Sequence, residues 1–173
     1  VTALRLLNTE SQDKADYLHN QLITDINVPS TYWECAESYL KGVGIYDVFL
    51  IEEQDFRNYK IFLRETGNFT KKQVFERTGF LRNLKKTLIQ EEYKELLNEI
   101  EQCNTVQERL KGNVRNFLIR QGIHHVKEID YRIRELYESE LRRTKTSSKG
   151  LEYLKTLDRI KQFDIRKEME TLS

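Results

Sequence analysis

Apolar side chains recur along most of this chain at intervals of three and four residues, the spacing that places them on one face of an α-helix. The first such stripe lies in residues 13–23 and contains Tyr17, Leu18, Leu22 and Ile23. Further stripes begin near residues 30, 52, 70, 91, 105, 130 and 151. The strict alternation of apolar and polar positions that marks β-strands is essentially absent. The pattern therefore predicts an all-α fold.

One segment of the sequence occurs twice, about 78 residues apart. Gly44-Ile45-Tyr46-Asp47-Val48 returns as Gly122-Ile123-His124-His125-Val126. The match continues at the same offset in five pairs: Ile51 and Ile129, Tyr59 and Tyr137, Leu63 and Leu141, Arg64 and Arg142, and Thr66 and Thr144. Self-similarity at a fixed offset indicates a repeated structural unit. We predict two small helical units in tandem, at residues 30–103 and 104–173, after a lead-in of residues 1–29 with a short helix.

Capping residues mark several predicted helix boundaries. Ser30, Thr70 and either Asn104 or Thr105 are expected to be N-caps, because a side-chain oxygen at that position accepts a hydrogen bond from a first-turn amide. Residues 144–150, rich in Ser, Thr and Lys, are predicted to form a loop before the last helix.

The composition is typical of a protein with much surface helix. The chain has 173 residues, of which 38% are hydrophobic and 33% charged, and its mean hydropathy is −0.70. No apolar run approaches the ~18 residues of a membrane-spanning helix, and no signal-peptide pattern opens the chain. We expect no membrane partner and a cytoplasmic location. Cys35 and Cys103 are expected to be free thiols rather than a disulfide.

The formal net charge of +1 conceals an uneven distribution. Residues 30–103 carry 11 basic and 13 acidic side chains, whereas residues 104–173 carry 16 and 11. The second predicted unit is therefore basic, although less so than a dedicated nucleic-acid-binding domain.

The order of elements in each copy resembles the core-binding, SAM-like helical domain of tyrosine recombinases, the phage and transposon integrases. The second copy supplies Val126-Lys127-Glu128-Ile129, Tyr137, Leu141, Lys145, Ser147, Ser148, Lys149, Leu157, Ile160 and Phe163. The first copy supplies Val48, Ile51, Tyr59, Leu63, Thr70, Lys71, Lys72, Leu81 and Leu84. The resemblance covers about residues 30–170 and implies two SAM-like helical units that grip duplex DNA.

The resemblance also implies what the chain does not contain. Tyrosine recombinases cleave DNA with a Tyr nucleophile in a separate C-terminal domain that carries a His-x-x-Arg element. Here the residues three positions after the histidines are Leu22, Lys127 and Glu128. We therefore expect no catalytic residue in this chain, and as partners its own missing catalytic domain and a further copy of the chain on the DNA.

Cofactor and metal sites are not expected either. The sequence has no Gly-rich phosphate loop and no cysteine spacing that would hold zinc. His124 and His125 are expected to form a solvent-facing pair in a connector.

The candidate DNA contacts are basic residues and hydroxyl groups at helix starts, where free backbone amides also favour phosphate. The densest cluster is Arg142, Arg143, Lys145, Ser147, Ser148 and Lys149. A second group is Thr70, Lys71 and Lys72, and a basic stripe contains Arg77, Arg82, Lys85 and Lys86. The alternative interpretation is that these charges only keep the surface soluble.

Two functions remain open from the residues alone. The first is a DNA-binding helical module of a site-specific tyrosine recombinase. The second is a helical module for protein–protein interaction or regulation that binds no nucleic acid. A self-contained enzyme is not supported.

Overall fold

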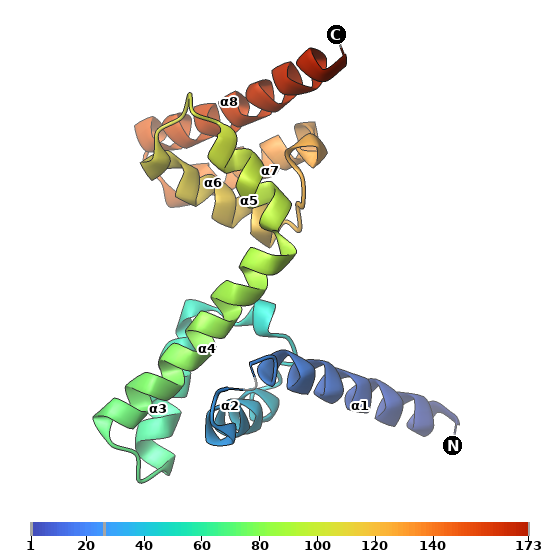
Figure 1. Cartoon of the computed structure of the whole chain (residues 1–173), viewed down its shortest axis with the longest axis vertical. Helices are drawn as coiled ribbons and strands as arrows, with labels where there is room; N and C mark the ends of the chain where they lie inside the picture. Colours follow the sequence, from blue (N-terminus) through green and yellow to red (C-terminus); the bar gives the residue numbers. More distant parts are fainter. Residues whose placement is uncertain (1, 26, 173) are drawn as a thin grey trace. The chain divides into compact units, whose positions relative to one another are not determined.

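The fold is all-helical over the part of the chain described by the computed structural model, residues 2–25 and 27–172, with side chains from residue 12 onward. No strand occurs in that part, which confirms the all-α prediction. The elements in order are α1 (Thr2–Leu22), α2 (Ser30–Gly42), the 3₁₀ turn η1 (Val48–Leu50), α3 (Glu53–Thr66), α4 (Lys71–Glu92), α5 (Lys94–Gln102), α6 (Glu108–Arg120), the 3₁₀ turn η2 (Val126–Glu128), α7 (Tyr131–Thr144) and α8 (Ser147–Leu172) (Figure 1).

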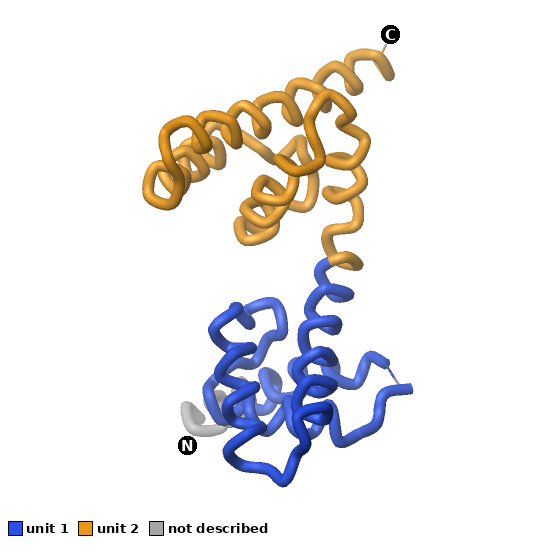
Figure 2. The backbone as a smooth tube through the Cα atoms, turned by 90° about the vertical axis from the view of Figure 1, so that its left-hand side faces the viewer, with its two compact units in different colours: residues 1–89 blue, residues 90–173 orange. Residues whose placement is uncertain are grey.

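The chain forms two compact units, Val1–Ile89 and Gln90–Ser173 (Figure 2). This boundary differs from the one expected at residues 103 and 104, because α5 packs on α6 and η2 of the second unit. Leu96 and Ile100 of α5 are fully buried there. The supposed lead-in is also part of a core, since α1 packs on α2 and buries Leu18 and Leu22.

Corresponding elements follow the same order in both units, and the correspondence extends further toward the N-terminus than the sequence match suggested. The second half of α1 matches α5 at an offset of 78 residues, so that Leu18 matches Leu96 and Leu22 matches Ile100. Then α2 matches α6, η1 matches η2, α3 matches α7 and α4 matches α8.

A side chain from the first helix anchors the 3₁₀ turn in each unit. The Gln21 Oε1 atom accepts a hydrogen bond from the Val48 amide at 2.8 Å. The Glu99 Oε2 atom accepts one from the Val126 amide at the same distance. Val48 and Val126 are 78 positions apart, and so are Gln21 and Glu99. The same hydrogen bond therefore occurs in both units. Its acceptor is a side-chain amide in the first unit and a carboxylate in the second.

The helices α2 and α6 end in the same way. Gly44 and Gly122 adopt positive φ angles of 78° and 72°. In each case the next amide bonds to a carbonyl five residues earlier, Ile45 to Leu40 at 2.8 Å and Ile123 to Leu118 at 3.0 Å. This Schellman arrangement needs a left-handed residue, which glycine adopts without a steric penalty. The repeated Gly-Ile pair is therefore a helix stop.

Each core contains a matched pair of aromatic rings. The ring centroids of Tyr39 and Tyr59 lie 5.1 Å apart, and those of Phe117 and Tyr137 lie 4.5 Å apart. The Tyr137 hydroxyl donates to Asn113 Oδ1 at 2.6 Å, whereas the buried Tyr59 hydroxyl has no hydrogen-bond partner among the described residues. Burial raises the pKa of both tyrosines above the ordinary value.

The offset between the units falls from 78 to 76 after the loop before the last helix, because that loop has four residues in the first unit and two in the second. The buried residues Leu81 and Leu84 then match Leu157 and Ile160. At this offset Lys85 matches Lys161. Lys85 donates to the Ile51 carbonyl beside η1, and Lys161 donates to the Val126 and Lys127 carbonyls of η2.

An ion pair between the last two helices has opposite polarity in the two units. In the first, Arg82 of α4 makes a bidentate pair with Glu53 of α3, at 2.7 and 2.8 Å. In the second, Arg134 of α7 pairs with Asp158 of α8, at 2.8 and 3.0 Å. Arg82 and Asp158 are equivalent at the offset of 76.

Two of the three predicted N-caps are wrong. Ser30 is the first residue of α2, after Pro29, and makes no capping hydrogen bond. The helix α6 begins at Glu108 after Gln107, beyond both Asn104 and Thr105. Thr70 is confirmed, because its hydroxyl accepts from the Gln73 amide at 3.2 Å while the Gln73 side chain accepts from the Thr70 amide.

The predicted loop over residues 144–150 is too long. The helix α8 begins at Ser147, so Ser147, Ser148 and Lys149 lie in its first turn. Gly150 lies in α8, and the Cβ of a residue in its place would meet the Leu141 Cβ at 3.6 Å, which shows that α8 passes close to α7 there.

Candidate nucleic-acid interface

Four cations lie where α7 ends and α8 begins, and we call Arg142, Arg143, Lys145 and Lys149 the basic corner. All four side chains are exposed. No acidic residue occurs between Glu140 and Glu152, so the four cations lie in a segment of the chain without carboxylates. The densest predicted cluster is therefore brought together by a helix end, a two-residue loop and a helix start.

Only one of these cations is held by a carboxylate. Arg142 Nη2 lies 2.9 Å from Glu138 Oε1, one turn earlier on α7, and 77% of the Arg142 side chain is exposed. Such a surface pair contributes little to stability. Among the described residues, Arg143, Lys145 and Lys149 have no ion pair. Three of the four charges are thus available to an external anion.

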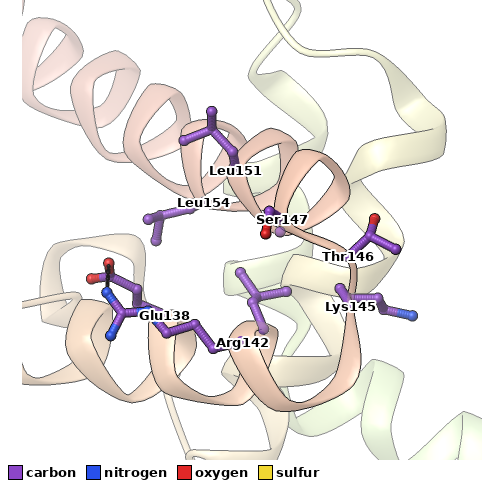
Figure 3. A pocket seen from close by; sticks show the side chains of 9 residues that line it. Glu138, Arg142, Lys145, Thr146, Ser147, Leu151 and Leu154 are labelled. Atoms are coloured by element: carbon purple, nitrogen blue, oxygen red, sulfur yellow. Dashed lines mark hydrogen bonds and ion pairs between the residues drawn. The ribbon is translucent and has the colours of Figure 1, made fainter.

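A hollow of about 240 Å³ lies beside the corner, between the end of α7 and the start of α8 (Figure 3). Its walls combine Leu141 and Leu154 with polar groups of Thr146 and Ser147. Figure 3 shows Arg142 directed toward Glu138 and Lys145 directed away from the hollow. The cations therefore flank the hollow, an arrangement that suits an extended polyanion better than a small enclosed ligand.

The first turn of α8 adds backbone donors to the corner. The amides of residues 147–149 have no partner within an α-helix, and in the described part of the chain no side chain accepts from them. A helix N-terminus attracts anions through these amides and through the helix dipole. Ser147, Ser148 and Lys149 therefore present hydroxyl, amide and ammonium donors together.

The equivalent position in the first unit is less available. The Thr70 hydroxyl is occupied by the Gln73 amide. Lys72 lies 3.9 Å from Glu76, a loose contact, and Lys71 is exposed. The group of Thr70, Lys71 and Lys72 therefore offers one or two cations without the free helix start of the second unit.

The structure contradicts the predicted basic stripe along α4. Arg77 is buried, with its guanidinium 4.3 Å from the Phe69 ring centre. Arg82 is bound to Glu53, which lowers the pKa of that carboxyl group through the hydrogen bond. Lys85 donates to a backbone carbonyl, and burial lowers its pKa. Lys86 alone among these residues is both exposed and without an ion pair in the described structure.

His124 and His125 are partly exposed, with 41% and 32% of their side chains accessible, but both contact carboxylates that the sequence pattern did not assign to them. His124 lies 3.2 Å from Glu92 and stacks on the Tyr93 ring at 4.6 Å. His125 lies between Glu95 at 3.0 Å and Glu99 at 3.4 Å. The acidic run at 91–95, with Glu99 one turn further on, was the available signal, because it places carboxylates on one face of α5. No group of side chains able to hold a metal ion occurs among the described residues.

Because α5 belongs to the second unit, the net charges of the two units differ from those expected from the sequence. Residues 90–173 carry 17 basic and 16 acidic side chains, and residues 1–89 carry 12 of each. The expected basic second unit is therefore nearly neutral as a folded body, because acidic α5 belongs to it. The basic corner is thus a local group of four cations on a unit whose net charge is close to zero.

Comparison with protein-family models, with curated proteins and with solved structures finds no match to this chain. Among the described residues no helix is both long and apolar enough to cross a lipid bilayer.

Proposed function

We propose that this chain is a nucleic-acid-binding helical module of the kind that tyrosine recombinases use, and that the basic corner of its second unit holds the phosphate backbone of duplex DNA. The observation that carries the proposal is the group of exposed, unpaired cations beside an uncapped helix start. Strand cleavage and rejoining would belong to a separate catalytic domain and not to this chain.

Phosphate contacts of this type give affinity without reading sequence. Lys and Arg release condensed counterions from DNA, and each contact adds about one unit to the dependence of log affinity on log salt. Backbone amides and hydroxyls fix the position of the phosphate. We therefore expect weak, salt-sensitive and sequence-tolerant binding from the isolated chain.

Charge reversal at the corner tests the proposal. Changing Arg143, Lys145 and Lys149 to Glu should abolish binding to random-sequence duplex DNA at low salt, because it replaces three phosphate contacts by three repulsions. The unaltered chain should lose affinity between about 50 and 200 mM salt. Fluorescence anisotropy of a labelled duplex measures both effects.

A matched variant separates the corner from bulk charge. Lys127, Lys155 and Arg166 of the same unit are also exposed and have no ion pair in the described structure. Their change to Glu alters net charge by the same amount and should leave most of the affinity. Equal loss in both variants would mean that only total charge matters, and unchanged affinity in the corner variant would exclude the corner.

The alternative, a helical protein-interaction module, is favoured by one observation. Both folded units are close to neutral, and some of their cations are held in ion pairs, such as those of Arg82 and Arg134. Absence of DNA binding even at low salt would support this second function over the first.

A further inference from the structure

The last helix extends past the end of its unit. At the offset of 76 that relates α4 to α8, residue 168 matches Glu92, the last residue of α4. Residues 169–172 of α8 therefore match residues 93–96, which begin the first helix of the second unit. This register places the start of a first helix at residues 169–172, which we call the tail of α8.

The side chains of the tail support this assignment. Leu18, Leu96 and Leu172 occupy the same position of successive first helices. Leu18 and Leu96 are both 0% exposed in their cores, whereas Leu172 is 88% exposed. Met169 matches Tyr93 and is 66% exposed, while Tyr93 is buried against His124. The tail carries the apolar residues of a first helix without the core that covers them.

These exposed residues form one stripe. Ile165, Met169 and Leu172 lie at positions i, i+4 and i+7, which share a helix face. An amphipathic face of this kind becomes stable when another element covers it. In the second unit α5 packs on α6 and η2, and in the first unit α1 packs on α2 and binds η1 through Gln21.

The chain already contains a helix with the required continuity. The second half of α1 matches α5, whose first residue, Lys94, corresponds to Asp16, yet α1 begins 14 residues before Asp16 and is unbroken from Thr2 to Leu22. In the order of the chain, the first half of α1 therefore precedes a first helix, just as the end of α4 precedes α5. A long helix can thus run directly into the first helix of a unit, as α1 does, and α8 is likewise unbroken up to Leu172.

We propose that residues 166–172 are the start of a third helical unit of the same type, which continues from α8 in the same polypeptide and covers Met169 and Leu172. The partner of this stripe is then a second helix and a 3₁₀ turn equivalent to α6 and η2.

A fusion protein tests the register. Residues 1–172 are joined to a second copy of residues 97–168, so that Leu172 replaces Leu96 and Met169 replaces Tyr93. Met169 is the only methionine in the sequence, and it stays unique in this fusion. Its oxidation by hydrogen peroxide, followed by mass spectrometry, should be at least about tenfold slower than in the 173-residue chain, because sulfoxide formation requires exposure.

Two controls isolate the contact. Two alanines inserted between Leu172 and the grafted segment turn the apolar stripe by about 200° around the helix, and protection of Met169 should be lost. Leu172→Asp should unfold the grafted unit in the fusion, as seen by circular dichroism, but should leave the melting of the 173-residue chain unchanged.

Three results would overturn the proposal. The grafted segment could remain unfolded, or Met169 could oxidise as fast in the fusion as in the original chain. Alternatively, Met169 could be protected in the original chain with rising concentration, which would identify a second copy of the chain as the occupant of the stripe.

Discussion

At the scale of single residues, the two units show how one position tolerates different chemistry. Tyr59 and Tyr137 occupy the same buried site, but only the Tyr137 hydroxyl has a hydrogen-bond acceptor, Asn113. The residue at the position of Asn113 in the first unit is Cys35. Burial of the Tyr59 hydroxyl therefore costs free energy of folding. In the second unit the hydrogen bond from Tyr137 to Asn113 offsets the equivalent cost.

This difference predicts opposite results for one substitution. Tyr137→Phe should lower the free energy of unfolding by about 1 kcal/mol, because it removes a hydrogen bond. Tyr59→Phe should be neutral or stabilising, because it removes an unsatisfied buried hydroxyl. Denaturant titration measures both, with Trp33, the only tryptophan, reporting on the first unit. Equal destabilisation by the two changes would contradict the hydrogen-bond argument.

The sequence could predict burial at this scale but not the pairing of charges. Five tyrosines fall on apolar stripes, and of these Tyr39, Tyr59, Tyr93 and Tyr137 are buried whereas Tyr153 is only partly buried. Arg82, by contrast, looks free in the sequence and is bound to Glu53, 29 residues away. A pattern of local spacing contains no information on such a partner.

At the scale of elements, the first helix of each unit both supplies core residues and positions the 3₁₀ turn. Gln21 and Glu99 bind the amides of Val48 and Val126. The sequence match between the units began only at Gly44, because the first helices share few identical residues. Their equivalence could be recognised only from burial and from this shared hydrogen bond.

The hydrogen bond that Glu99 accepts from the Val126 amide predicts different results for two substitutions of Glu99. Gln21→Ala and Glu99→Ala should each cost about 1–3 kcal/mol, because each leaves the amide at the start of a 3₁₀ turn without its acceptor. Glu99→Gln keeps the acceptor oxygen and should stay within about 0.5 kcal/mol of the original chain. Thermal unfolding at neutral pH compares the variants. A loss as large for Gln as for Ala would show that the carboxylate charge matters instead.

At the scale of the whole molecule, the boundary between the units follows from packing rather than from helix count. The sequence repeat assigns α5 to the end of the first unit, because the two copies are expected to open at equivalent helix starts near residues 30 and 104. The burial of Leu96 and Ile100 against α6 and η2 assigns it to the second unit. Only contacts distant in sequence could decide this.

Fragments test the boundary directly. Residues 90–173 should fold alone, with a cooperative thermal transition, because they contain a complete core. Residues 104–173 should not, because the fragment lacks the two fully buried side chains of α5 and leaves α6 uncovered. Circular dichroism melting of the two fragments distinguishes the outcomes. Cooperative folding of the shorter fragment would restore the boundary at residue 104.

The reversed polarity of the ion pair between the last two helices has a consequence for folding. Neighbouring repeats of similar sequence risk exchanging helices while they fold. If α4 docked on α7, Arg82 would meet Arg134, and if α8 docked on α3, Asp158 would meet Glu53. Each wrong assembly brings like charges together, whereas each correct one joins opposite charges. The two units thus carry a built-in discrimination against mispairing, in a chain whose apolar faces alone could not tell one partner from the other.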